Sequence, residues 1–206
     1  MRRFQLAALI AIPVLYYFGL IVGAATYPDY SHVTRYASEL GAAGAPYPDL
    51  FNYSIVAGGL AALFGAVGLA GALRDLSGGR LWSVLAGICL ALWGAGMMMG
   101  GWFPMPDDRH GGFGLVLAGP LVPLFTLLAL RRATGAGAML AFLAFVFVGQ
   151  LVLLAIMFGV GELVTRANVG IWQRINSGFG IPWLAVLGLW LLARADTVNE
   201  SSPAHA

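Results

Sequence analysis

Six apolar stretches, separated by charged residues, prolines or polar loops, constrain this chain more than any other feature. They comprise residues 4–25, 51–73, 81–103, 112–130, 137–159 and 175–192. About 20 apolar residues cross the hydrocarbon core of a bilayer as a helix, and a helix satisfies its own backbone groups there. We therefore predict an all-α polytopic membrane protein, whose single domain over residues 1–195 is a six-transmembrane-helix bundle. Residues 196–206 are predicted to form a disordered cytoplasmic tail.

Charge is sparse in this chain and limits its partners and cofactors. Only 10% of the 206 residues are charged, whereas a soluble domain has about 25%, so the chain has no room for a separate soluble domain. A net charge of +2 is too small to indicate nucleic-acid binding. All basic residues are arginine, and the absence of lysine excludes retinal or pyridoxal phosphate held as a Schiff base. The sequence identifies no other cofactor.

The first apolar stretch has a competing interpretation as a signal peptide. Gly23-Ala24-Ala25 resembles a cleavage site. The apolar core of a signal peptide is typically about 7–15 residues, and residues 4–25 are longer. We expect this stretch to be retained as the first membrane span.

Arginine placement predicts the orientation in the membrane. The segments expected on one side contain seven arginines: Arg2, Arg3, Arg74, Arg80, Arg131, Arg132 and Arg194. The opposite segments contain four: Arg35, Arg109, Arg166 and Arg174. Cytoplasmic loops carry the excess of arginine and lysine, so both termini are predicted to be cytoplasmic, with the long polar loops outside the cell membrane.

The stretch from Gly101 to His110 contains the densest group of ionisable side chains. Asp107, His110 and, from the first loop, His32 could ligate zinc or another divalent ion, since histidine nitrogen and carboxylate oxygen suit such metals. Alternatively, Ser38 could be a nucleophile with His110 as its base and Asp108 orienting the histidine. Neither set has diagnostic spacing. A simpler interpretation is that the two aspartates cap the following helix.

Other polar residues of the outer loops could bind a ligand. Arg35, Arg109 and Arg174 could hold a phosphate or carboxylate head group. Glu39, Asn52 and Glu162 lie in or beside the same loops and complete the predicted ligand-binding set.

Features inside the apolar stretches have structural interpretations. Pro120, Pro123 and Pro182 should kink their helices. Gln150 is explained by an interhelical hydrogen bond. Residues 51–73 contain five glycines, and such glycine-rich faces allow close helix packing or an oligomer contact.

Several motifs together resemble the membrane family known as domain of unknown function 998. They are Tyr36-Ala37-Ser38-Glu39-Leu40-Gly41, Phe51-Asn52, Gly101-Trp102-Phe103-Pro104, His110 and Gln173-Arg174. The family pattern has aspartate where Glu39 stands here. The resemblance implies six spans and no established activity, and it implies that Ser38, Glu39, Asn52, His110 and Arg174 share one outer-face site.

Three functions are compatible with these patterns. The leading hypothesis is the binding of a lipid or other small amphiphile from the bilayer by a polar vestibule on the outer face. The first alternative is a membrane-embedded hydrolase that uses His110, Asp108 and Ser38, with or without a metal. The second alternative is a structural or assembly subunit of a membrane complex, packed through its glycine-rich faces.

Overall fold

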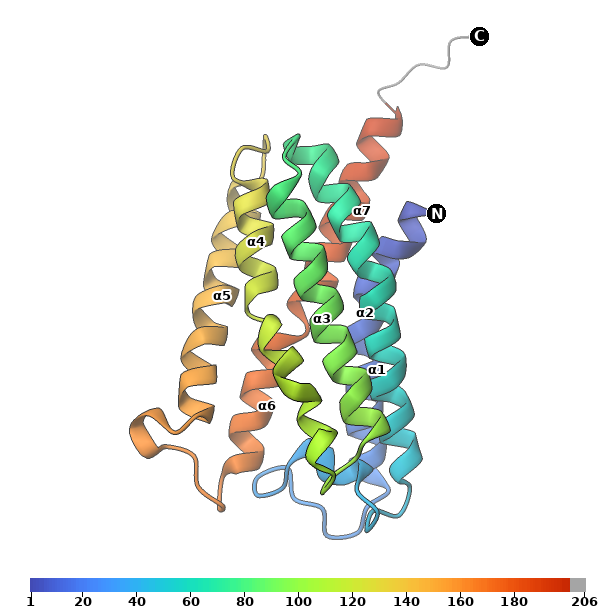
Figure 1. Ribbon diagram of the computed structural model, residues 1–206, viewed down its shortest axis with the longest axis vertical. Coiled ribbons are helices and arrows are strands. Elements are labelled where there is room, and N and C mark those ends of the chain that lie inside the picture. The colour runs from blue at the N-terminus through green and yellow to red at the C-terminus, as the bar shows by residue number, and fades with distance from the viewer. Residues whose placement is uncertain (201–206) are drawn as a thin grey trace.

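The computed structural model describes residues 1–200, and side chains as far as Ala195. Within that range the chain is all helical and has six segments long and apolar enough to cross a membrane. Four spans are continuous α-helices: α1 (Arg2–Ala25), α2 (Pro48–Ser77), α3 (Leu81–Trp102) and α5 (Gly137–Met157). Figure 1 shows each of them running along the long axis of the bundle. The predicted fold class, a six-helix membrane bundle, is confirmed.

The other two spans are each broken near their middle. The fourth span begins as the 3-10 helix η2 (Asp108–Ala118) and continues as α4 (Leu121–Leu130). The sixth span consists of α6 (Val169–Gly180) and α7 (Trp183–Glu200). Pro120 and Pro182 occupy the two breaks, since proline lacks the amide hydrogen that would continue the helix. The prolines were predicted to kink continuous helices, but the structure replaces the first half of the fourth span by a 3-10 helix.

Helix boundaries differ from those predicted in the second span and at the end of the last span. α2 begins at Pro48, because proline suits the first helical turn. It ends at Ser77, and the following Gly78 caps it with a φ of 64°, the left-handed conformation that glycine favours. α7 extends to Glu200, so residues 196–200 continue the helix where a tail was predicted. The remainder of the predicted tail, residues 201–206, lies outside the described residues.

The glycines of α2 pack against helices of the same chain. A Cβ added at Gly59 would lie 2.5 Å from the carbonyl oxygen of Gly94 in α3, and one at Gly68 would lie 2.6 Å from Cβ of Gln5 in α1. Gly58 and Gly65 likewise face α3 and α1. Small residues allow this close backbone approach. The glycine-rich face predicted as a possible oligomer contact is therefore enclosed within the bundle.

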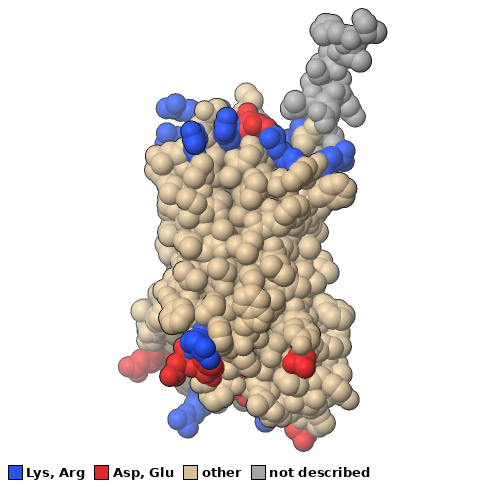
Figure 2. Space-filling view, turned by 45° about the vertical axis from the view of Figure 1, so that its right-hand side comes forward, with Lys and Arg blue, Asp and Glu red and all other residues tan. Residues whose placement is uncertain are grey.

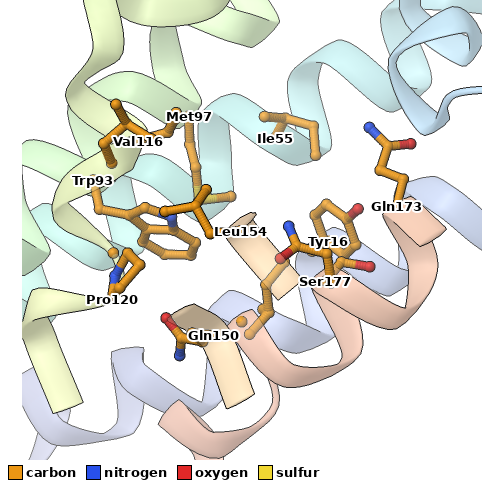
Figure 3. Close-up of a pocket in the computed structure, with 15 residues that line it drawn as sticks. Tyr16, Ile55, Trp93, Met97, Val116, Pro120, Gln150, Leu154, Gln173 and Ser177 are labelled. Atoms are coloured by element: carbon orange, nitrogen blue, oxygen red, sulfur yellow. The ribbon is translucent and has the colours of Figure 1, made fainter. Parts of the chain in front are cut away.

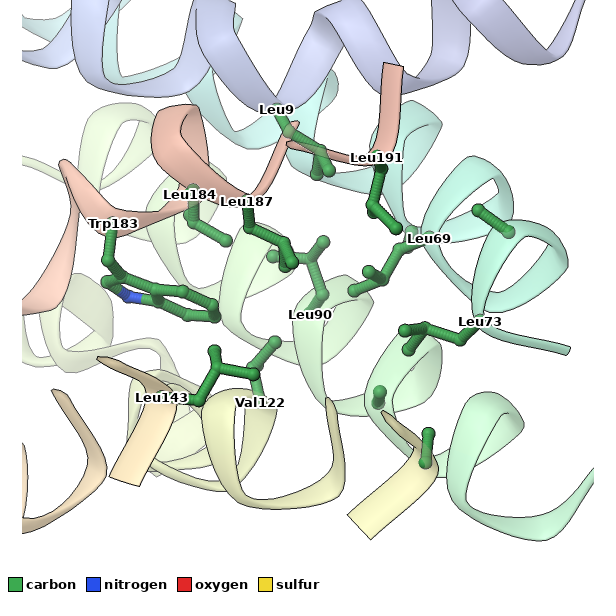
Figure 4. Packing of buried hydrophobic residues seen from close by; sticks show 14 of the residues in the cluster. Leu9, Leu69, Leu73, Leu90, Val122, Leu143, Trp183, Leu184, Leu187 and Leu191 are labelled. Atoms are coloured by element: carbon green, nitrogen blue, oxygen red, sulfur yellow. The ribbon is translucent and has the colours of Figure 1, made fainter. Parts of the chain in front are cut away.

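A dense leucine core fills the half of the bundle that contains both chain ends. Figure 4 shows side chains from α1, α2, α3, α5 and α7 meeting there. Those that are at most 1% exposed include Leu9, Leu69, Leu73, Leu90, Leu143, Leu184 and Leu187. A smaller cluster around Leu20, Leu40 and Phe51 lies in the other half.

The two ends of the bundle differ in charge. The start of α1, the end of α7 and the α2–α3 and α4–α5 turns lie at one end, which we call the terminal end (Figure 1). Segments 26–47, 103–108 and 158–168 lie at the other, the loop end. Figure 2 shows arginines crowding the terminal end, most acidic side chains at the loop end, and an uncharged band between them.

Candidate functional site

Arg174 of α6 holds the long 26–47 segment against the loop end of the bundle. Its guanidinium donates to the Arg35 carbonyl oxygen at 2.9 Å, to His32 Nδ1 at 3.0 Å and to the Tyr30 hydroxyl. Because Nδ1 accepts this bond, His32 is neutral here. Its pKa is lowered by partial desolvation and by the nearby positive charge of Arg174. We call this group of contacts the Arg174 latch.

Backbone contacts reinforce the latch on either side of it. A Cβ at Gly170 would lie 2.6 Å from the carbonyl oxygens of both His32 and Arg35, so only glycine allows the loop this close to α6. The Ala37 amide donates to Gln173 Oε1 at 2.5 Å. The short 3-10 helix η1 (Ala37–Gly41) then inserts Leu40, which is 1% exposed, into the smaller core cluster.

Glu39 and Asn52 stabilise the same segment. Glu39 accepts from the Tyr36 amide at 2.8 Å and lies 4.0 Å from the Arg35 guanidinium, so it caps η1. The buried Asn52 donates to the Gly41 carbonyl oxygen at 2.9 Å. Three of the predicted ligand-binding residues, Glu39, Asn52 and Arg174, therefore have structural partners within the protein.

The segment after α3 forms a separate polar group. Asp107 accepts from the Arg109 guanidinium at 2.7 and 3.0 Å and from the Arg109 amide at 2.8 Å. These hydrogen bonds lower the pKa of the Asp107 carboxyl to about 2. The same guanidinium stacks 3.8 Å above the Phe103 ring. Arg109, like Arg174, is thus engaged by its own neighbourhood.

Two of the three residues predicted as a hydrolytic triad, Ser38 and His110, are paired with other groups. His110 Nδ1 lies 3.0 Å from the Phe103 carbonyl oxygen, and the Ser38 hydroxyl lies 3.1 Å from the Met105 sulfur. Asp108 is exposed. Among the described residues, no hydrogen bond joins Ser38, His110 and Asp108.

The remaining predicted site residues are not gathered either. Glu162 is exposed, with a φ of 52°, in the α5–α6 connection that Figure 1 shows at the edge of the bundle. His110, Asp107 and His32 were predicted as metal ligands, but the described part of the chain contains no cluster of three or more His, Cys, Asp or Glu side chains that could hold a metal ion. Residues 26–47 contact α6 through the Arg174 latch, whereas the hydrogen bonds of Asp107, Arg109 and His110 stay within residues 103–110. His32 and His110 therefore have different surroundings.

A cavity of about 270 Å³ lies deeper in the bundle, beside both helix breaks (Figure 3). Its apolar wall comes from α3, η2 and α5, and includes Trp93, Leu117 and Leu154. Pro120 and Ile181 mark the two breaks at its edge. Val116 and Leu117 of η2 are more than a third exposed, so this wall borders the surrounding lipid. We call this space the break cavity.

Polar side chains face the apolar wall across the break cavity. They are Tyr16 of α1, Gln150 of α5, and Gln173, Asn176 and Ser177 of α6. Among the lining residues, none is Asp, Glu, His, Lys or Arg. Irregular backbone at membrane depth is tolerated where it is buried in protein or lines a cavity, and both breaks satisfy that condition.

The polar groups of the break cavity retain hydrogen-bonding capacity. Gln150 has one long contact, 3.4 Å to the Phe179 carbonyl oxygen. The side-chain oxygen of Gln173 accepts from the Ala37 amide, so its amide nitrogen remains available as a donor. Among the described residues, no protein group hydrogen-bonds the Asn176 side chain or the Trp93 indole nitrogen. This arrangement can bind a polar head group that is uncharged.

Comparison with known proteins gives one match. The sequence model of the family described as "Protein of unknown function (DUF998)" matches residues 10–190. The chain belongs to this family. No curated protein and no solved structure matches it.

The part of this DUF998 chain that matches includes both helix breaks and the whole break cavity. Sequence reasoning missed the cavity as a site, although it noted Gln150 as an isolated polar residue. The available signal was the combination of mid-span prolines with amide side chains on neighbouring spans, Gln150 and Asn176. Each feature alone has an ordinary structural explanation.

Proposed function

We propose that this DUF998 member binds a small amphiphile with an uncharged, hydrogen-bonding head group, and that the ligand occupies the break cavity. The observation that carries the proposal is a cavity lined by amides, hydroxyls and an indole but by no charged side chain. Its volume of about 270 Å³ is near the lower end of ligand pockets, which span about 300–1,000 Å³.

The head group is assigned to the α6 side of the cavity. Asn176 and Gln173 offer amide groups there, and Tyr16 offers a hydroxyl. The Ser177 hydroxyl donates to the Arg174 carbonyl oxygen at 3.1 Å, so it can serve the ligand only as an acceptor. A polar group left without a partner in an apolar environment is costly, so a bound hydroxyl or ester would compensate Asn176. The alkyl part would lie along Trp93, Leu117 and Leu154 and reach the lipid past η2.

The charges at the loop end argue against an anionic head group. Arg109 is neutralised by Asp107, and Arg174 is occupied by the first loop. Arg35 lies 5.1 Å from the Tyr27 ring centre and near Glu39. Opening any of these arginines to a phosphate would sacrifice existing contacts.

We further propose that both termini are cytoplasmic. This is supported by the arginine-rich terminal end and by the excess of arginine that cytoplasmic loops carry. In that orientation the break cavity opens toward the outer half of a cell membrane, and its ligand would come from the outer leaflet.

Two glycines of α6 allow a matched test of ligand binding. A Cβ at Gly180, which lines the break cavity, would meet nothing within 4 Å, and the same holds for Gly178, which does not line it. Gly180→Leu should fill the cavity, whereas Gly178→Leu should not. The protein would be reconstituted in phosphatidylcholine nanodiscs and labelled with a photoreactive dodecanol, with photoreactive dodecanoate as the charged comparison.

We expect dodecanol to label peptides of η2, α5 or α6 in the wild type and in Gly178→Leu, and labelling to fall at least about ten-fold in Gly180→Leu. Asn176→Leu should lower labelling while Ser54→Ala, which removes a hydroxyl outside the cavity, should not. Equal labelling of the two glycine variants, or stronger labelling by dodecanoate, would contradict the proposal.

A further inference from the structure

The connection between α5 and α6 exposes several apolar side chains. Phe158, Val160 and Leu163 are 72%, 62% and 47% exposed. We call residues 158–163 the apolar tip. Figure 1 shows it extending sideways from the end of α5, level with α6 and not beyond the loop end of the bundle. Because α6 belongs to a membrane span, the apolar tip lies at a depth that lipid can reach.

Local backbone geometry gives the apolar tip its shape. Gly159 and Gly161 have φ values of 95° and 78°, the left-handed conformation that glycine tolerates. Asn168 closes the segment, since its side chain donates to the Leu163 carbonyl oxygen at 2.9 Å and accepts from the Thr165 amide at 2.7 Å. The path of the chain is thus set by turns and hydrogen bonds within the segment. The apolar side chains of the tip remain available to a partner outside the bundle.

The lipid-facing surface of α5 continues into the apolar tip. Val148 and Leu151 are exposed on one face of this span. Phe158 follows Leu151 by about two helical turns on the same face, and its amide donates to the Leu154 carbonyl oxygen at 2.9 Å as in a helix. The partner that covers the exposed face of α5, which is lipid, is therefore also the partner that meets the tip.

We infer that the apolar tip inserts into the head-group region of the bilayer leaflet at the loop end and anchors the end of α5 there. Exposed Glu162 lies within the tip and exposed Arg166 follows it, and charged side chains are costly in hydrocarbon but tolerated at the interface. Their charges are opposite, so burial of apolar surface and not attraction to anionic lipid should hold the tip. This surface is separate from the break cavity and does not depend on the ligand proposed for it.

The test measures the membrane depth of nitroxide labels by electron paramagnetic resonance. The full-length protein is reconstituted in phosphatidylcholine nanodiscs that hold one copy each. In a Cys89→Ala background, the label is attached at Val160→Cys in the tip or at one of two exposed control positions, Thr165→Cys and Val33→Cys. Molecular oxygen dissolves in lipid whereas a charged nickel chelate stays in water, so the ratio of their collision rates with the label reports its depth.

We expect the ratio of oxygen to nickel-chelate collisions to be about ten-fold higher at position 160 than at either control, because an interfacial segment buries its apolar face in the boundary of the acyl chains. Adding Phe158→Gln and Leu163→Gln should lower the ratio at position 160 toward that of the controls. Adding Tyr47→Gln and Tyr53→Gln, which alter two exposed aromatic residues outside the tip, should leave it unchanged.

Two results would overturn the inference. A ratio at position 160 as low as at the controls would place the tip in water. A high ratio that is found only in nanodiscs holding two copies would assign the tip to a contact between copies of the chain.

Discussion

The break cavity and a second cavity of about 350 Å³, which lies between α1, α2 and α7 at the terminal end, are toward opposite ends of one bundle, and their walls are made in different ways. The break cavity is lined where two spans are interrupted, and its polar groups are amides and hydroxyls at membrane depth. The second cavity is lined by regular helix near the start of α1 and in the C-terminal parts of α2 and α7, and its polar groups are charged. A charged side chain costs little free energy near the membrane–water interface and much more in the middle of the bilayer. The depth of each cavity in the bundle is therefore matched by the kind of polar group that lines it.

The leucine core between the cavities explains how the bundle tolerates two interrupted spans. Core residues from α1, α2, α3, α4, α5 and α7 converge near the terminal end, whereas η2 packs mainly on α3. The free energy of unfolding should therefore come chiefly from the half of the bundle near the terminal end, and the proposed ligand binding from the half near the loop end. The following predictions test that division.

The largest expected effect is from shortening a core leucine. Leu90→Ala removes a side chain that is 0% exposed, and such changes cost about 2–5 kcal/mol of unfolding free energy. Leu154→Ala shortens a partly buried residue that already faces the break cavity, and should cost less than about 1 kcal/mol. Denaturant unfolding in detergent, followed by tryptophan fluorescence, compares the two. Equal losses would refute the division.

A smaller effect is expected from adding one methyl group to a glycine. In Gly59→Ala the new Cβ would collide with the Gly94 carbonyl oxygen of α3, so the two helices must separate, at about 1–3 kcal/mol. In Gly178→Ala the new Cβ meets nothing, and the change should stay within about 0.5 kcal/mol. The measurement is again the unfolding free energy. A neutral Gly59→Ala would mean that α2 and α3 are less tightly packed than the structure indicates.

These contrasts also explain which parts of the fold could be predicted from sequence. Hydropathy and length located all six spans, because burial in lipid acts on every residue of a span. The 3-10 conformation of η2 was not predictable in this way. A Cβ at Gly112 would lie 3.0 Å from Gly96 of α3, so the conformation of η2 is set by a neighbour distant in sequence.

The polar loops show a similar limit. Sequence placed Arg174 and His32 on the same face of the membrane, and the structure joins them through one hydrogen bond. Sequence also expected His110 in that group, but the Phe103 carbonyl oxygen lies 3.0 Å from its Nδ1. Hydropathy fixes the side of the membrane and not the path of a loop, which depends on local contacts such as those of Gly170.

The Arg174 latch should determine how firmly residues 26–47 stay docked on the loop end of the bundle. Arg174→Gln loses the bonds to Tyr30, His32 and the Arg35 carbonyl oxygen. Because hydrogen bonds to a charged group are lost, the loop should be released more often, and the rate of trypsin cleavage after Arg35 should rise by about ten-fold. Arg109→Gln removes an arginine whose partners lie in the second loop, so it should leave that cleavage rate unchanged. Equal acceleration in both variants would indicate general loosening of the loop end.

The smallest expected effect is a pH dependence of the latch. His32 Nδ1 can accept from Arg174 only while the imidazole is neutral. Its pKa is lowered in the docked loop, whereas a released loop should restore the ordinary value of about 6.5. Release therefore takes up a proton, so docking is fully favoured above about pH 6.5 and weakens as pH falls below it.

A fluorine label at Thr34→Cys in a Cys89→Ala background would report loop release by NMR between pH 8 and pH 5. We expect the released fraction to rise roughly three-fold at the acidic end. Tyr30, Arg35 and Glu39 surround the same contact, but none of them has an ordinary pKa between pH 5 and pH 8. His32→Asn, which keeps an acceptor near Nδ1 but cannot titrate, should abolish the dependence, whereas His110→Asn should preserve it. The opposite pattern would assign the response to the second loop, because His110 is the other histidine at this end of the bundle.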